Sequence, residues 1–293
     1  MTLEHKNLFD SYLNKSDFMA SEMNFTNLFM WRDFYNFEFF EINEMICLIA
    51  SPKGQEPFAY APIGSYTPER FRSSVNAIRE YFSEKEWRLV FRRVEESKLE
   101  YFERYTDGQI KIEYDRDNSD YIYLTENLIN LKGRKYHSKR NHINIFLKTY
   151  EYEYVELNES YIEEALRIDE EWNLGKEDGG NGIMYPERLA NREVLKNFAK
   201  LDCKGALIKV NGKFEAYTVG EIINNRYAVI HIEKANSSIK GIYAFINQKF
   251  CEYELRNILY VNREQDLGIE SLRRAKKSYN PIKYINKYNI YVN

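Results

Sequence analysis

The sequence predicts an α+β fold with mixed sheets, carried by two domains in tandem. Strand-like segments joined by two-residue turns predict antiparallel hairpins, and short apolar strands alternating with amphipathic helices predict mixed pairing. The length of 293 residues is that of about two ordinary domains. We therefore expect an N-terminal domain at 1–125, a helical connector at 126–150 and a C-terminal domain at 151–293.

The second half of the chain shows the clearest order of elements. Apolar residues at helical spacing predict a helix over 161–173 and another from Pro186, whose fixed φ suits a first helical turn. Asn211-Gly212 and Asn224-Asn225 predict the turns of a three-stranded meander. The elements expected next are a helix over 239–250, a strand at 258–262, a helix that Asp266 caps and Pro281 ends, and a last strand within 284–292.

The second hairpin allows a prediction of register. If Asn224-Asn225 is a two-residue turn, Thr218 lies opposite His231 and Ala216 lies opposite Glu233. Side chains alternate along a strand, so we expect His231 and Glu233 to share one face of the sheet.

The first half repeats part of this order without repeating its residues. The recurring order of elements indicates a fold duplicated in tandem. The expected elements are a hairpin of strands 37–42 and 45–50, a helix over 68–82, a strand at 87–94, a helix over 96–105 and a strand at 110–114.

Composition and charge exclude several classes of protein. The 42 Lys and Arg nearly balance the 45 Asp and Glu, which argues against a protein that coats nucleic acid through a high positive net charge. No apolar run approaches a membrane span, and the charged first residues do not resemble a signal peptide, so we expect a cytoplasmic protein without a transmembrane segment. No metal site is expected from the spacing of the cysteines and histidines, which are Cys47, Cys203, Cys251, His5, His137, His142 and His231.

The connector carries a local excess of positive charge, because 127–150 contains no acidic residue. In a continuous helix, Lys132, Lys135, Lys139 and His142 would share one face, which suits phosphate or nucleic acid. Pairing with the acidic helix at 161–173 is the alternative. A second basic group comprises Arg273, Arg274, Lys276 and Lys277. Together with the connector it could contact the phosphates of a tRNA acceptor stem, or it could simply be exposed to solvent.

The order of elements in the second half resembles the GNAT acyltransferase fold. Four segments resemble a bacterial family of tandem GNAT-like proteins related to the C-terminal aminoacyl-transferase domain of phosphatidylglycerol lysyltransferases, and more distantly the peptidoglycan aminoacyl-transferases. These segments are SEMNFTNLFMWR (21–32), KGRKYHSKRNHIN (132–144), HIEKAN (231–236) and NREQDLGIESLRRAKKSYNP (262–281).

The resemblance implies a donor site at the start of the helix that follows the meander. The usual pattern there is Q/R-x-x-G-x-G/A, and of its defining positions this chain matches Gly241 alone, with the bulky Tyr243 in place of a small residue. The corresponding helix of the first half has no glycine, so we expect no donor site there. The residues of the implied donor turn are Ser238, Ile239, Lys240, Gly241, Ile242 and Tyr243.

Acyl transfer to an amine needs a proton acceptor and a proton donor, or a hydrogen-bond donor, for the departing group. Glu233 and His231 are the candidates on the meander, and the GNAT resemblance makes Tyr279 a candidate phenol donor. Ion pairing and core packing are the alternatives. Further polar residues follow the strand at 258–262 and are candidates for binding substrate, although Asp266 suits the helix cap better; they are Asn262, Arg263, Glu264 and Asp266. The resemblance implies that an acid here could recognise the donor's amino group.

We therefore expect an acyl- or aminoacyl-transferase whose active cleft lies in the second domain. The donor would be either acyl-CoA or aminoacyl-tRNA, with tRNA a partner in the second case, and the acceptor a small-molecule or lipid amine or hydroxyl. Lys135, Lys139, Arg140 and His142 are the candidates for contact with substrate or RNA. The alternative is a non-catalytic ligand- or RNA-binding protein on a degenerate tandem fold; a plain acetyl-CoA-dependent N-acetyltransferase is the third hypothesis.

Overall fold

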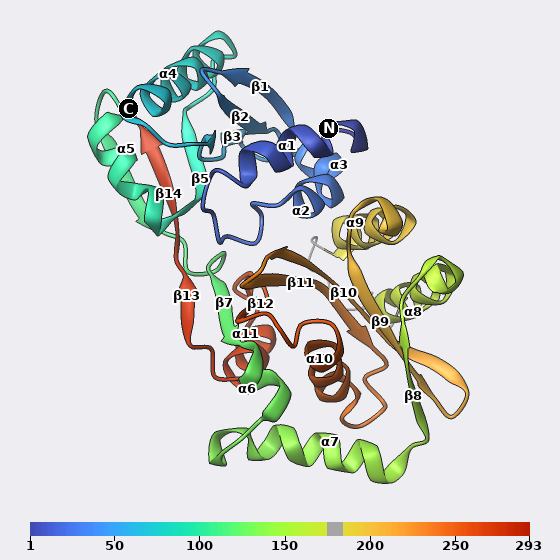
Figure 1. Ribbon diagram of the computed structural model, residues 1–293. Coiled ribbons are helices and arrows are strands. Elements are labelled where there is room, and N and C mark those ends of the chain that lie inside the picture. The colour runs from blue at the N-terminus through green and yellow to red at the C-terminus, as the bar shows by residue number, and fades with distance from the viewer. Residues whose placement is uncertain (175–183) are drawn as a thin grey trace. The chain divides into compact units, whose positions relative to one another are not determined.

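The computed structural model describes residues 1–174 and 184–293, which form two compact units (Figure 1). Unit 1 comprises Met1–Asp120, Gln265–Gly268 and Tyr284–Asn293, and unit 2 comprises Tyr121–Glu264 and Ile269–Lys283. These units do not follow the expected boundaries at 125 and 151. The difference arises because the end of the chain contributes its last strand to the sheet of unit 1.

Unit 1 is built on a sheet with the strand order β1-β2-β3-β5-β14-β6, in which β4 also pairs with β2. The hairpin of β1 and β2 forms where the sequence predicts it. The strands are β1 (Glu38–Ile42), β2 (Met45–Ala50), β3 (Phe58–Ala59), β4 (Ile63–Gly64), β5 (Val90–Glu95), β6 (Ile110–Tyr114) and β14 (Lys287–Val292). The helices are α1 (Lys6–Leu13), α2 (Phe25–Met30), α3 (Arg32–Tyr35), α4 (Pro68–Glu84) and α5 (Leu99–Tyr105), with 3-10 turns η1 (Leu3–His5) and η2 (Glu96–Lys98).

Strand β14 lies between β5 and β6 and is antiparallel to both. Figure 1 shows β14 near β5. Ile290, which is fully buried, pairs with Phe91 of β5 on one side and with Ile112 of β6 on the other. The strand predicted within 284–292 is thus confirmed, and it completes the sheet of unit 1.

Unit 2 is built on a sheet whose strands run in the order β7-β12-β11-β10-β9-β8. The strands are β7 (Asp120–Leu124), β8 (Tyr152–Glu156), β9 (Lys204–Val210), β10 (Lys213–Asn224), β11 (Tyr227–Ala235) and β12 (Tyr260–Asn262), and the chain leaves the unit through β13 (Lys283–Ile285). The helices are α6 (Thr125–Asn130), α7 (His137–Thr149), α8 (Ile162–Leu174), α9 (Met184–Lys196), α10 (Ile242–Tyr253) and α11 (Glu270–Lys277), with 3-10 turns η3 (Arg134–Tyr136), η4 (Glu159–Tyr161) and η6 (Phe198–Lys200).

The predicted register of the second hairpin is wrong. The turn is formed one residue later than expected, because Asn224 already pairs with Tyr227. Thr218 therefore lies opposite Glu233, not opposite His231, and Ala216 lies opposite Ala235.

A β-bulge further changes the alternation of side chains along β11. Ile230 pairs with Gly220 and Ile232 pairs with the adjacent Val219, which leaves His231 as the extra residue. A bulge re-aims the side chains on either side of it. Consequently His231 and Glu233 do not follow the simple alternation that placed them together.

The connector does not form one continuous helix. Helix α6 ends at Asn130. Its C-cap Leu131 has a φ of 47° and Gly133 has a φ of 89°, so two left-handed residues separate α6 from η3 and α7. The connector therefore bends at Gly133. The expectation that Lys132 shares a helical face with Lys139 is wrong, because Lys132 lies in this break.

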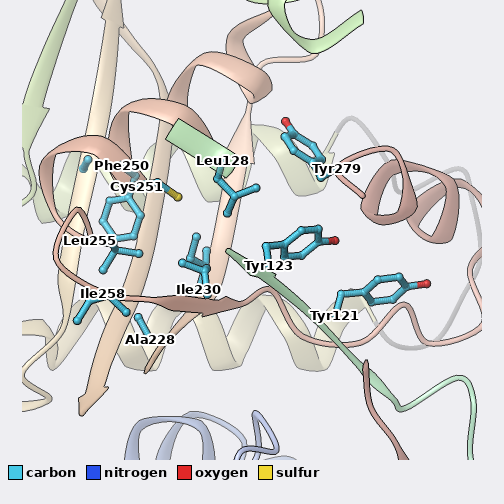
Figure 2. Packing of buried hydrophobic residues seen from close by; sticks show 12 residues of the cluster. Tyr121, Tyr123, Leu128, Ala228, Ile230, Phe250, Cys251, Leu255, Ile258 and Tyr279 are labelled. Carbon is cyan, nitrogen blue, oxygen red and sulfur yellow. The ribbon is translucent and has the colours of Figure 1, made fainter. Parts of the chain in front are cut away.

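A buried apolar cluster packs α10 against the sheet of unit 2 (Figure 2). The cluster contains Phe250 and Cys251 of α10, and Leu255 just after that helix. These side chains pack with Ala228 and Ile230 of β11. Burial raises the pKa of the Cys251 thiol to about 12, which disfavours the reactive thiolate at neutral pH. The rings of Tyr123 and Tyr279 belong to the same cluster and lie at its other side (Figure 2).

Candidate active site

The candidate site begins where β11 and β12 stop pairing. These parallel strands pair at Tyr227, Ala228 and Val229, and the last pair is Val229 with Asn262. Asn262 is fully buried; its side chain donates to the Tyr227 hydroxyl at 2.7 Å, and its Oδ1 accepts from the backbone N–H of Glu264 at 2.7 Å. Glu264 has a φ of 56°, so the chain turns away from the strand here.

Beyond the last pair, Glu233 of β11 contacts residues from two other segments. Its Oε1 accepts from Nη2 of Arg263 at 3.1 Å, and its Oε2 accepts from Nδ2 of Asn247 on α10 at 2.9 Å. The Glu233 and Arg263 side chains are each only 13% exposed, so this ion pair is mostly removed from water. A bond of this kind, between partly buried ions, fixes both side chains more firmly than a surface pair does.

Two cations lie over the ring of Tyr279. The Arg263 guanidinium carbon is 4.5 Å from the ring centroid, and Lys139 Nζ of α7 is 4.0 Å from it. Attraction between a cation and the face of an aromatic ring holds such arrangements. We call Lys139, Glu233, Asn247, Arg263 and Tyr279 the Glu233 cluster; its members come from five separate segments of unit 2.

Burial shifts the protonation of two members of the Glu233 cluster. Burial, helped by the neighbouring Arg263 charge and opposed by Glu233, lowers the pKa of Lys139 to about 8. Burial also raises the pKa of Tyr279, which keeps its phenol protonated. The cluster therefore offers an amine that exchanges its proton near neutral pH and a phenol that can donate a hydrogen bond.

His231 lies in a different group of charges. Its Nδ1 is 3.0 Å from Glu264 Oε1 and its Nε2 is 3.5 Å from Glu221 Oε2 on β10. Burial opposes the charged imidazole, but the two carboxylates outweigh it and raise the pKa of His231 to about 9. A raised pKa favours the protonated imidazole, so the structure does not favour His231 as the proton acceptor.

The implied donor turn packs against α7. Gly241 has a φ of 88°, and a Cβ at this position would lie 2.1 Å from the carbonyl oxygen of His142 and 3.1 Å from Cβ of Phe146. The glycine is thus required by the close approach of two backbones. Ile242 is fully buried, and the Tyr243 hydroxyl accepts from Trp172 Nε1 at 2.8 Å and donates to the Ala235 carbonyl at 3.0 Å.

The other residues of this turn have local contacts. Both the N–H and the hydroxyl of Ser238 donate to Asn236 Oδ1, Ile239 packs against the apolar core, and Lys240 is exposed. Asn236, Ser237 and Ser238 do not cap α10, because Gly241 occupies its N-cap position.

The candidates for RNA contact have separate places in the structure. Lys135 and His142 are exposed on η3 and α7. Arg140 donates through Nη1 to the carbonyls of Leu131 and Gly133, so it holds the bend of the connector. Lys139 lies against Tyr279. The single basic face expected for these residues does not form.

Asp266 does not cap α11, which contradicts the predicted cap. The N-cap of that helix is Ile269. Asp266 belongs to unit 1, is fully buried, accepts from the N–H of Gly268 at 3.0 Å and lies 3.3 Å from Nη1 of Arg116. The carboxylate therefore closes a turn just before the helix.

In the basic group of α11, Lys276 has turned inward and donates to the Arg263 carbonyl, whereas Arg274 and Lys277 are exposed. The residue that sequence reasoning missed is Asn247. Its position was open to prediction, since it is polar yet lies between Tyr243 and Phe250 on the apolar face of α10.

Residues 1–174 and 184–293 contain no group of three or more His, Cys, Asp or Glu arranged to hold a metal ion. No helix among them is long and apolar enough to cross a bilayer.

Comparison with known proteins identifies a family match over nearly the whole chain. Residues 14–291 match the family described as phosphatidylglycerol lysyltransferase, C-terminal. The crystal structure of a conserved protein of unknown function from Bacteroides thetaiotaomicron is similar with a TM-score of 0.92 and 33% identity, over 100% of this chain and 98% of that one.

Two more distant relatives complete the comparison. L-PGS from Bacillus licheniformis shares the fold, with a TM-score of 0.66 and 13% identity over 98% of this chain and 91% of that one. An uncharacterised protein of Mycoplasmoides gallisepticum is 26% identical over 191 residues, which are 61% of this chain and span only 59% of that protein. The predicted α+β class and GNAT-like fold are confirmed.

Proposed function

The chain belongs to the family of phosphatidylglycerol lysyltransferase C-terminal domains, and from this premise we propose that it is an aminoacyl-transferase with its reaction centre at the Glu233 cluster. One observation carries the proposal. A carboxylate, an amine, a guanidinium, a phenol and an amide from five segments of unit 2 meet where β11 and β12 separate. Such convergence of polar groups in a mostly buried place is typical of an active site.

The cluster contains the groups that acyl transfer requires. A hydroxyl or amine of the acceptor attacks the ester carbonyl of the donor; the new bond to the acyl carbon forms, and the ester bond to the donor breaks. Glu233 receives the proton of the attacking group. Arg263 and Lys139 stabilise the negative charge that develops on the carbonyl oxygen, and the phenol of Tyr279 supports the departing oxygen.

Among the two donors expected from the sequence, aminoacyl-tRNA has more support than acyl-CoA. The turn that would receive a coenzyme pyrophosphate is packed against α7, with His142 at the position that a Cβ of Gly241 would reach. Helix α7 also carries exposed basic residues suited to phosphates. The family description names phosphatidylglycerol, so a lipid hydroxyl is the acceptor that we propose. Aminoacyl-tRNA is made in the cytoplasm, where we expect this protein to act.

The test is the substitution Glu233→Gln. We expect it to reduce transfer of lysine from lysyl-tRNA to phosphatidylglycerol in vesicles by roughly a hundredfold, because the amide cannot accept the proton. Glu215→Gln on neighbouring β10 is the matched control, since Glu215 contacts Lys213 and Asn236 and lies outside the cluster. Thermal unfolding should show both variants folded. Full transfer by Glu233→Gln would remove Glu233 from the mechanism.

A second candidate function is RNA binding without catalysis, which the closed donor turn favours. In that case wild-type protein would retain tRNA at low salt and transfer no amino acid. Lys135→Ala should then weaken retention and reduce the dependence of affinity on salt by about one unit of slope. Absence of tRNA binding at low salt would exclude this function.

A further inference from the structure

We propose that Lys139 and Arg263, at the Tyr279 ring, form a subsite for one phosphodiester group of a nucleic-acid strand. The inference rests on the proposed function, because it uses the Glu233 cluster, and it names the group that the cluster binds. Its arguments are the balance of charge, two buried atoms without partners, and the surroundings of α7.

The charges of the Glu233 cluster do not cancel. Lys139 contacts no carboxylate within ion-pair distance in the part of the chain that the structure describes, and its partner is the Tyr279 ring. Arg263 is paired with Glu233, which is the acid of the cluster. Two cations and one carboxylate leave one positive charge, which a single monoanion would neutralise.

Two buried atoms of the cluster have no hydrogen-bond partner among the described residues. One is Nη1 of Arg263, a donor, and the other is Oδ1 of Asn247, an acceptor on a fully buried side chain. Buried polar atoms are nearly always satisfied, so this pair indicates a missing ligand or water. A phosphodiester has an anionic oxygen for Arg263 and Lys139, and the adjoining ribose has a hydroxyl for Asn247.

The surroundings of Lys139 favour a nucleic acid as the source of this group. Lys139 is part of a stretch, 127–150, without any acid, in which Lys135 and His142 are exposed. A strand whose phosphodiester reaches the cluster would meet these cations on its neighbouring phosphates. Most of the binding there would be independent of base sequence.

Isothermal titration calorimetry on the full chain tests the subsite with a minimal probe, the dinucleotide cytidylyl-adenosine, which has one phosphodiester. We expect binding that Lys139→Gln weakens roughly tenfold, the effect of losing one charge-assisted hydrogen bond. Lys148→Gln is the matched control; it removes an exposed lysine from the same helix and should leave the affinity unchanged. Lys139 has no ion pair to break, so the variant should fold, which thermal unfolding checks.

Proton uptake gives a second readout that a surface lysine would not produce. The charged or titratable groups that face Lys139 are Arg263, Glu233 and Tyr279, and burial with Arg263 lowers its pKa to about 8. A bound monoanion restores the ammonium form, so binding at pH 8 should take up a fraction of a proton. Titrations in two buffers of different ionisation enthalpy measure it, and Lys139→Gln should abolish it. The phosphodiester itself does not titrate in this range.

Glycerophosphoglycerol is the second probe, because it has the same phosphodiester on a lipid headgroup. Binding of that compound alone would overturn the nucleic-acid assignment. Binding of neither probe at millimolar concentration, or dinucleotide binding that Lys139→Gln leaves unchanged, would overturn the subsite. These measurements need no turnover: a protein that transfers lysine and binds neither probe refutes the subsite alone, and one that binds the dinucleotide without transfer refutes the proposed function alone.

Discussion

At the scale of single residues, one extra position in β11 separates two side chains that the sequence places together. His231 occupies the bulge and lies between Glu221 and Glu264, whereas Glu233 pairs with Arg263 and Asn247. In the first group two carboxylates flank the imidazole, and in the second a carboxylate contacts a guanidinium and an amide. Each group contains two buried atoms without a hydrogen-bond partner among the described residues: His231 Nε2 and Glu221 Oε2 in the first, Arg263 Nη1 and Asn247 Oδ1 in the second. The proposed chemistry uses Glu233, because its cluster also contains an amine and a phenol.

The His231 group predicts a dependence of stability on pH. The pKa of His231 is raised from 6.5 to about 9 in the folded protein, so its stabilisation is complete below pH 6.5 and is lost as the pH rises through 9. We expect the difference in free energy of unfolding between wild type and His231→Gln to fall by about 3 kcal/mol between pH 6.5 and 9.5, as measured with urea.

Comparison with the variant is needed because Lys139 acts in the opposite direction. Its lowered pKa means that burial of the charged amine costs stability below pH 8, and this cost is relieved between pH 8 and the ordinary lysine value of 10.5. Both proteins contain Lys139, so its contribution cancels in the difference. A difference that does not vary with pH would show that His231 is uncharged at neutral pH.

At the scale of elements, the position of α7 depends on a glycine in another helix. Gly241 begins α10 in a left-handed conformation and lies against the backbone of α7 at His142. The resemblance to acetyltransferases implies that this glycine admits a phosphate. In this chain Gly241 instead allows α7 to pack closely against the start of α10. Helix α7 carries Lys139, a member of the Glu233 cluster.

The substitution Gly241→Ala tests this packing. Its Cβ would collide with the His142 carbonyl, so we expect destabilisation by about 3 kcal/mol or more, measured by urea unfolding. Gly133→Ala is the matched control: its φ of 89° is nearly the same, but no atom lies within 4 Å of the added Cβ, so only the backbone strain of about 1 kcal/mol remains. Equal effects of the two variants would contradict a packing role for Gly241.

At the scale of the whole molecule, the chain returns to unit 1 after completing unit 2 and inserts β14 between β5 and β6. A buried lysine at the start of this strand anchors it. Lys287 Nζ lies 2.5 Å from Glu22 Oε2 and 2.7 Å from Asp120 Oδ1, and all three side chains are at most 3% exposed. The ion group therefore joins the beginning, the middle and the end of the sequence.

Removal of this lysine should damage unit 1 severely. Lys287→Met removes the cation that Glu22 and Asp120 share and leaves Arg93, 3.7 Å from Glu22, as the neighbouring charge; we expect a loss of about 3–5 kcal/mol in the free energy of unfolding. Lys111→Met on the exposed face of β6 is the control, and it should have little effect because its ion pair with Glu113 lies in solvent. Adding Glu22→Gln and Asp120→Asn to Lys287→Met should restore part of the loss. No restoration would show that packing, rather than charge, is what Lys287 supplies.

Much of the local structure was predictable from the sequence. Turn residues and apolar periodicity predicted the hairpin of β1 and β2, the three-stranded meander and α10, because these signals act over a few residues. Four of the five residues in the Glu233 cluster were also predicted as candidates, namely Lys139, Glu233, Arg263 and Tyr279. Charged and phenolic groups at the end of a strand or on a helix face are recognisable in a sequence. Asn247 was missed because a single amide in an apolar face is a weak signal.

The sequence by itself determined the fold class and the family, because both depend on the order of elements and on short motifs. Only the tertiary structure decided the sheet that β14 joins, the position of His231 in a bulge and the approach of α7 to Gly241. The physical reason is the long separation, along the sequence, of the residues that make these contacts. Pairing of Tyr288 with Val94 and Tyr114, or contact of Lys139 with Tyr279, joins residues more than a hundred positions apart, and such contacts are selected by the packing of whole sheets.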